Sequence, residues 1–121
     1  MPGIIDNELG KVVISEDIVA MIAGYAALEN YGLVDMHSKS AADTLIKFIG
    51  GESRKKGVKV TFDSEGKPDI DLYVKLMYGL SMNAVAQNIM SHVRYRVEEM
   101  TGLNVGNVNV HIEGVWVDSD N

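Results

Sequence analysis

The sequence predicts an α+β domain in which a small mixed or antiparallel sheet is covered on one face by two long helices. Short segments that are rich in β-branched residues, or that alternate between apolar and polar residues, are typical of strands. Two longer segments carry apolar residues at helical spacing, and glycines separate the segments. The order of these elements along the chain is β-α-β-β-α-β, which predicts a two-layer sandwich.

The first part of the chain predicts one strand and the first long helix. Residues 10–14 form a β-branched run, and Ser15 supplies an N-cap oxygen to the helix that follows and that Gly32 is expected to end. Because this helix is rich in alanine and almost uncharged, we expect it to be buried on more than one side. Its expected apolar stripe consists of Ile18, Ile22 and Tyr25. A weaker helical segment is expected over residues 38–49.

The middle of the chain predicts an antiparallel pair of strands. Residues 58–62 alternate between apolar and polar side chains, and residues 63–68 contain the aspartate, glycine and proline that are typical of a turn. The strand after this turn shows the clearest alternation in the chain. Its apolar residues, which we expect to face the helices, are Ile70, Leu72, Val74, Leu76 and Tyr78.

The longest helix is expected over residues 81–101, where Gly102 would end it, and a last strand follows and extends toward Trp116. The apolar seam of this helix consists of Val85, Ile89, Val93, Val97 and Met100. We expect the seam to pack on the sheet face that carries Leu72, Val74, Val110 and Ile112.

The 121 residues predict one domain over residues 9–117, preceded by a flexible N-terminus over residues 1–8 and followed by an acidic tail over residues 118–121. The N-terminus lacks the basic and then apolar pattern of a signal peptide. No apolar run reaches the roughly 18 to 20 residues that a membrane span needs. We therefore expect a cytoplasmic protein.

The composition excludes several classes of function. The chain has no cysteine, which removes disulfides, thiolate zinc sites and a cysteine nucleophile. It has 11 Lys and Arg against 17 Asp and Glu, and the resulting net charge of −6 argues against a general nucleic-acid binder.

No catalytic, cofactor-binding or metal-binding residue follows from the sequence. The three histidines have none of the spacings typical of metal ligands, which favours solvated side chains. They are His37, His92 and His111. Asp63, Asp69 and Asp71 flank one hairpin but lack the oxygen-ligand density of a calcium loop. Because phosphate loops and nucleophile motifs are also missing from the sequence, we expect a protein that is no enzyme and takes no cofactor or small-molecule substrate.

A basic loop over residues 53–59 is the first candidate interaction surface. Its basic residues are Arg54, Lys55, Lys56 and Lys59. Such a loop can meet anionic lipid headgroups, nucleic acid or an acidic partner, although charge runs are commonly solvated loops that balance an acidic chain. The basic loop is the basis of an alternative function, a nucleic-acid-binding or regulatory module.

The second candidate surface is the sheet face that the two helices leave open. Tyr73 and Met77 are expected to project from it, and both are larger and more apolar than a solvated strand requires. No proline lies within an expected strand to discourage pairing at the sheet edges. Because identical chains are the commonest partners in symmetric assemblies, we expect a homo-oligomer that forms through the sheet rather than through the basic loop.

Several segments match a known family when they are taken as an ordered set. They are Gly10–Ile14, the helix with Ile22 and Ala23, Lys56–Val60, Asp69–Val74, Tyr78–Gly79, Met100–Leu103 and Val108–Ile112. This set resembles the alkaline shock protein family, the envelope stress response family of mainly Gram-positive bacteria. The lack of long charged tails makes the chain similar to the short paralogues.

The resemblance implies a small, cytoplasmic, non-enzymatic protein that supports cell-envelope homeostasis or the stress response. It also implies self-assembly and, for some members, a position near the membrane through a membrane-anchored protein partner. The family has no catalytic residues that could be assigned to positions of this chain.

Overall fold

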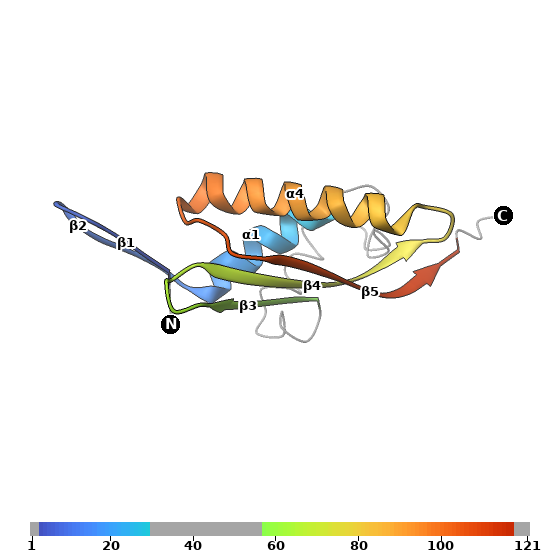
Figure 1. The fold of residues 1–121 in the computed structure, drawn as a ribbon, viewed down its shortest axis with the longest axis horizontal. Helices are drawn as coiled ribbons and strands as arrows, with labels where there is room; N and C mark the ends of the chain where they lie inside the picture. Colours follow the sequence, from blue (N-terminus) through green and yellow to red (C-terminus); the bar gives the residue numbers. More distant parts are fainter. Residues whose placement is uncertain (1–2, 30–56, 118–121) are drawn as a thin grey trace.

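The computed structural model describes residues 3–29 and 57–117, and within them the chain forms five strands and two helices. Figure 1 shows their arrangement in space. The elements are β1 (Gly3–Asn7), β2 (Gly10–Ile14), α1 (Glu16–Leu28), β3 (Val58–Phe62), β4 (Pro68–Met77), α4 (Met82–Thr101) and β5 (Val108–Trp116).

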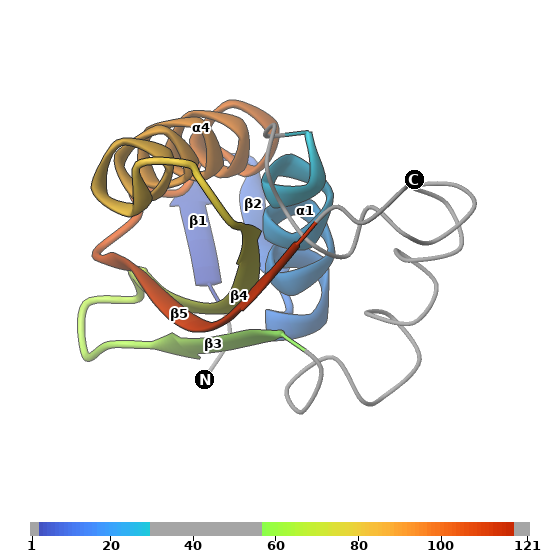
Figure 2. The ribbon, with the colours of Figure 1, turned by 90° about the vertical axis from the view of Figure 1, so that its right-hand side faces the viewer.

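The main sheet has three strands in the order β3-β4-β5. The pair β3–β4 is antiparallel and the pair β4–β5 is parallel, so the sheet is mixed. Both helices lie on the same side of this sheet (Figures 1 and 2). Helix α1 packs against β3, β4 and α4, and helix α4 packs against β5. The predicted two-layer α+β sandwich is therefore confirmed.

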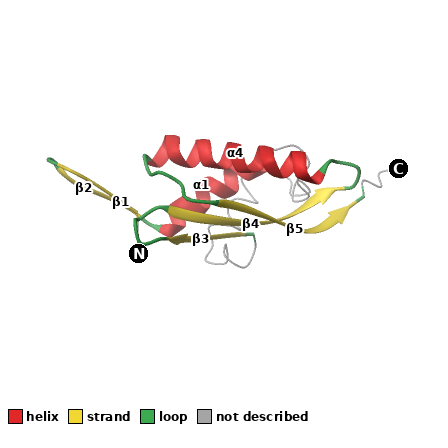
Figure 3. Cartoon of the chain, in the orientation of Figure 1, coloured by secondary structure: helices red, strands yellow, loops and turns green. Residues whose placement is uncertain are grey.

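Strand β2 does not join the main sheet. It pairs with β1 in an antiparallel hairpin, closed by the turn residues Glu8 and Leu9, that projects from the body of the domain (Figures 1 and 3). The expectation of a flexible segment over residues 1–8 missed β1. The reason is that β1 has too little alternation of its own to predict a strand, and it is ordered by pairing with the β-branched residues of β2.

Helix α1 begins where the sequence predicts, because the Ser15 side chain accepts a hydrogen bond from the Ile18 backbone N–H at the N-cap. The helix ends at Leu28, before the expected Gly32, which lies outside the described residues. It is buried on more than one side, as predicted. Its apolar stripe was wrong at two positions: Ile18 and Tyr25 are exposed, while the small residues around Ala23 and Ala26 face the core and allow close packing.

Helix α4 has the predicted ends, with Ser81 as N-cap and Gly102 in the left-handed conformation at φ 81°. Ile89, Val93 and Val97 are fully buried. Met100, expected in the same seam, is 64% exposed, because Thr101 continues the four-residue spacing after Val97 and takes the inward position. Val85 is half-buried and packs at the edge of the core.

The sheet contributes the other half of the core. Ile70, Leu72 and Leu76 of β4 are buried beneath the helices, with Val74, Val110 and Ile112 packed at the margin. Tyr78, expected in this row, is 73% exposed, because β4 ends at Met77. Strand β5 continues to Trp116 as predicted, past an irregularity in register beside Val74. The helix expected at residues 38–49 lies outside the described residues.

Candidate functional site

A stacked pair of rings lies on the sheet face opposite the helices. Strand alternation places Asp71 and Tyr73 of β4 on this face, and the parallel register places Asn109 and His111 of β5 directly beside them. The rings of Tyr73 and His111 are stacked, with centroids 4.4 Å apart and planes within 10° of parallel. Tyr73 is thus half-buried against a neighbouring ring rather than free in solvent.

The carboxylate of Asp71 holds this pair in place. Its Oδ1 lies 3.0 Å from His111 Nε2 and accepts a hydrogen bond from Asn109 Nδ2 at 3.1 Å. Lys59 of β3 stands opposite Asp71 in the antiparallel register. The His111 hydrogen bond is the largest cause that lowers the pKa of Asp71 below its ordinary value of 3.8, and the Asn109 bond and the charges of His111 and Lys59 add to it against the effect of burial.

The lowered pKa of Asp71 predicts a loss of stability in acid. Above the ordinary pKa the carboxylate is ionised in the folded and unfolded chain, and its contacts stabilise the fold in full. As the pH falls through the lowered pKa, the native carboxylate is protonated and this contribution is lost. Asp71→Asn should therefore make the free energy of unfolding fall less steeply than in the wild type between about pH 5 and pH 2 in urea titrations.

The control for this titration is Glu113→Gln, which changes an exposed carboxylate on β5. We expect this variant to keep the wild-type pH dependence. An Asp71→Asn variant with the same slope as the wild type would contradict the link between the Asp71 contacts and acid stability.

The structure brings together only some of the residues expected on an interaction surface. Lys59 is exposed on β3, next to the Asp71 cluster, and Tyr73 is part of the ring stack. Met77 is half-buried at the end of β4, opposite Trp116 in register and on the same face as Tyr73. Arg54, Lys55 and Lys56 lie outside the described residues, so the basic loop as a whole is not placed.

The carboxylates and histidines weighed as ligands have local partners instead. Asp63 accepts hydrogen bonds from the backbone N–H groups of Glu65 and Lys67 in the turn, and Asp69 accepts one from Asn107. His92 and His111 are solvent-accessible at the surface, where each also pairs with a carboxylate, and His37 lies outside the described residues. Among residues 3–29 and 57–117, no three His, Asp or Glu side chains come together as a metal site would require.

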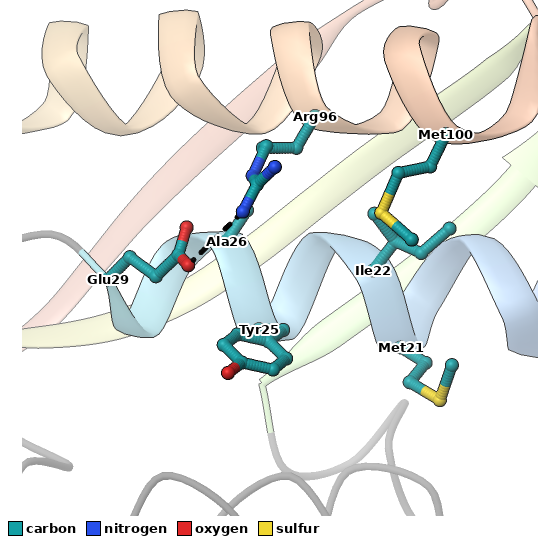
Figure 4. A pocket seen from close by; sticks show the side chains of 7 residues that line it. All are labelled: Met21, Ile22, Tyr25, Ala26, Glu29, Arg96 and Met100. Carbon is teal, nitrogen blue, oxygen red and sulfur yellow. Dashed lines mark hydrogen bonds and ion pairs between the residues drawn. The ribbon is translucent and has the colours of Figure 1, made fainter.

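A pocket between the two helices was not found by sequence reasoning. It has a volume of about 430 Å³, and its apolar wall combines α1 residues with Met100 of α4 (Figure 4). The lining residues are Met21, Ile22, Tyr25, Ala26, Glu29, Arg96 and Met100. The only signal in the sequence was the stripe containing Tyr25, which was assigned to the core. The part of its lining that the structure describes has no nucleophile beside a base, which favours apolar contact over group transfer.

One end of this pocket is closed by charged residues that join the helices. Glu29 lies 2.6 Å from His92 Nε2 through one oxygen and 3.5 Å from an Arg96 nitrogen through the other (Figure 4 shows the Arg96 pair). The His92 hydrogen bond, followed by the contacts of Arg96, lowers the pKa of Glu29 against the effect of burial. These contacts fix the end of α1 against α4.

The segment between α4 and β5 contains the strongest part of the family resemblance, and its contacts are structural. Thr101 Oγ1 donates to the Val97 carbonyl and accepts from the Leu103 N–H. Arg94 donates to the carbonyls of Val105 and Gly106 at 2.7 and 2.8 Å. This motif sets the path of the chain from the helix into the sheet.

The fold and these surfaces define a small α+β sandwich protein with an open sheet face. Residues 4–117 match the alkaline shock protein 23 family, which has a cell envelope-related function, and the chain belongs to this family. The resemblance seen in the sequence is thereby confirmed. None of the described helices has the length and apolar character that crossing a membrane requires.

Three relatives come from Bacillus and Streptococcus. The chain is 38% identical to the uncharacterised protein YloU of Bacillus subtilis over 112 residues, which is 92% of each chain. It is 34% identical to YqhY of the same organism, covering 94% of this chain and 83% of the relative. It is 32% identical to Spy1614 of Streptococcus pyogenes, covering 97% of each chain. No solved structure matches the chain.

Proposed function

We propose that this protein supports the cell envelope by binding, without catalysis, as a self-associating cytoplasmic protein. A membrane-anchored protein partner would hold it near the membrane. The envelope-related function of the family and its relatives in Gram-positive bacteria support the envelope role.

The observation that supports binding best is the sheet face opposite the helices. Neither described helix covers it, and it presents the Tyr73–His111 ring stack held by Asp71 (Figure 2). A pre-ordered aromatic pair surrounded by polar groups is typical of a contact surface, since little side-chain entropy remains to be lost on binding. The described lining of the pocket between the helices is mainly apolar, and its two charged residues, Glu29 and Arg96, pair with each other, which supports binding over catalysis.

Self-association through this face makes a direct prediction. Sedimentation over a hundredfold concentration range should show mass above the 13.2 kDa of one chain. Tyr73→Glu should lower that mass, because it places a charge beside Asp71 and removes the ring stack. Replacing Arg54, Lys55 and Lys56 together should leave the mass unchanged.

Two outcomes would contradict the proposed function. A strict monomer at every concentration would exclude self-association. Turnover of a substrate that survives repurification, and that is lost on changing one polar residue, would exclude a purely binding role.

The alternative, a nucleic-acid-binding or regulatory module, depends on the basic loop. The described basic residue of that segment, Lys59, lies on β3 opposite Asp71, and its charge helps to lower the pKa of that carboxyl. Binding of nucleic acid would require Arg54, Lys55 and Lys56 and would weaken steeply as the salt concentration rises.

A further inference from the structure

The hairpin of β1 and β2 exposes several large apolar side chains to solvent. Leu9 is 97% exposed, Val13 60%, Val12 52% and Ile4 46%. The hairpin contacts the body at its base, where Gly3 leaves no room for a side chain against Leu103, and it then extends away from the domain (Figure 1). The turn of the hairpin and strand β2 therefore present apolar side chains to solvent.

A two-stranded ribbon of this kind is incomplete as a sheet. Two strands alone are marginally stable in water, and stability needs a third strand or a covering layer. Within the described part of the chain, β1 and β2 pair only with each other, so one edge of each strand is free. Free edges with β-branched residues and no proline are the places where strands of other chains add.

We propose that the ribbon pairs with the ribbon of a second copy through the free edge of β2, forming a four-stranded sheet in the order β1-β2-β2-β1. This interface is separate from the sheet-face contact proposed above, and the two have in common only that both need a second copy. The exposure of the side chains decides which strand edge pairs, and the charge of that strand favours a second copy of this chain as its partner.

Exposure favours β2 over β1 as the pairing edge. Val12 and Val13 are each more than half exposed, whereas Ile4 is 46% exposed and Ile5 is half-buried. The two valines lie on opposite faces of the ribbon, because side chains alternate along a strand. A second ribbon beside β2 would thus extend the apolar surface on both faces.

Charge favours an antiparallel pair of β2 strands related by a two-fold axis. The strand has one charged residue, Lys11, near its tip. When the pair is centred on Val12, Lys11 lies opposite Val13 of the other copy, so the two lysines are diagonal neighbours and not a facing pair. Each Lys11 also stands opposite Asp6 of β1 in its own ribbon, which offsets its charge. No like charges then face each other, and a two-fold contact of this kind closes on itself.

The first test compares two valines of similar exposure. Val13→Lys places a charge on the pairing strand, while Val117→Lys places one on an exposed valine after β5 (65% exposed). In a Tyr73→Glu background, sedimentation should show a dimer, and Val13→Lys should weaken its association at least tenfold while Val117→Lys leaves it unchanged. At concentrations at which the parent is monomeric, thermal unfolding of the Val13→Lys variant should match that of the parent, because Val13 lies outside the core.

The second test uses the absence of cysteine from the chain. Val12→Cys should give a disulfide-linked dimer on mild oxidation, because the pair nearest the two-fold axis brings identical residues within disulfide range. Leu9→Cys should not, although Leu9 is more exposed, because the antiparallel arrangement separates the two tips.

The results separate this inference from the proposed function. Equal cross-linking at residues 9 and 12, or association that Val13→Lys leaves unchanged, would overturn the ribbon contact while self-association stands. A wild-type chain that associates but becomes monomeric with Tyr73→Glu alone would also overturn it. A wild-type monomer at every concentration would overturn both.

Discussion

Truncating Ile89 to alanine should lower the free energy of unfolding by about 2–5 kcal/mol, the range for removing a large buried side chain. Ile89 is fully buried at the middle of α4 and belongs to the same core cluster as Leu72 and Ile70 of the sheet. Its loss would leave a cavity between the two layers, which both helices and the sheet would border. Urea unfolding followed by circular dichroism measures this change.

Met100→Ala is the matched control, because it also truncates a long apolar side chain of α4. Met100 is 64% exposed, so its change should cost less than about 0.5 kcal/mol, as expected for an exposed surface position. A loss at Ile89 as small as that at Met100 would contradict the packing of α4 on the sheet.

Ile89 and Met100 show which buried positions of α4 can be predicted from the spacing of apolar residues. The spacing of four placed Val85, Ile89, Val93 and Val97 on one face correctly, because a helix brings residues four apart together. The prediction was wrong at Met100, which was placed in the seam because it is apolar, although it breaks the spacing of four. Thr101 continues the spacing after Val97 and is buried, because its hydroxyl donates a hydrogen bond to the Val97 carbonyl within the last turn. Burial follows position on the helix before it follows hydrophobicity.

The N-terminal ribbon shows a different limit. Propensity predicts β2 from its β-branched residues, but it gives no partner for that strand. Pairing with β1 depends on a turn at Glu8 and Leu9, which are not the Asn-Gly or Asp-Gly pair of a tight two-residue turn. The signals lie on either side of them: the Asn7 side chain accepts a hydrogen bond from the Leu9 N–H, and Gly10 takes a positive φ.

The candidate site was predictable in composition but not in geometry. Alternation placed Asp71, Tyr73, Asn109 and His111 on the outward face of two strands. Their contacts depend on the parallel register of β4 and β5, which joins residues about forty positions apart, and nothing local sets that register. The pocket between the helices was missed for the same reason, since it arises from the angle and phase of α1 against α4.

The register of β4 and β5 depends in turn on the segment that leaves α4. Arg94 fixes this segment with two hydrogen bonds from one guanidinium to the carbonyls of Val105 and Gly106, and Glu98 accepts a bond from the Val105 N–H. Such a fork of donors cannot be replaced by the single charge of a lysine. The carbonyls would lose a charged donor in a half-buried place.

Arg94→Met should therefore lower the free energy of unfolding by about 1.5–3 kcal/mol, the range for hydrogen bonds to a charged group. The matched control is Arg96→Met, two residues further along the same helix, whose ion pairs with Glu29 and Glu99 are 3.5 and 3.4 Å long and lie at the surface. That change should cost less than about 1 kcal/mol, as surface ion pairs do. Urea titrations of the two variants measure the difference, and hydrogen exchange should show faster exchange at Ile70 and Gly106, whose N–H groups bond across this junction. Equal losses in the two variants would mean that Arg94 contributes only surface charge and that the path from α4 into β5 is held by other contacts.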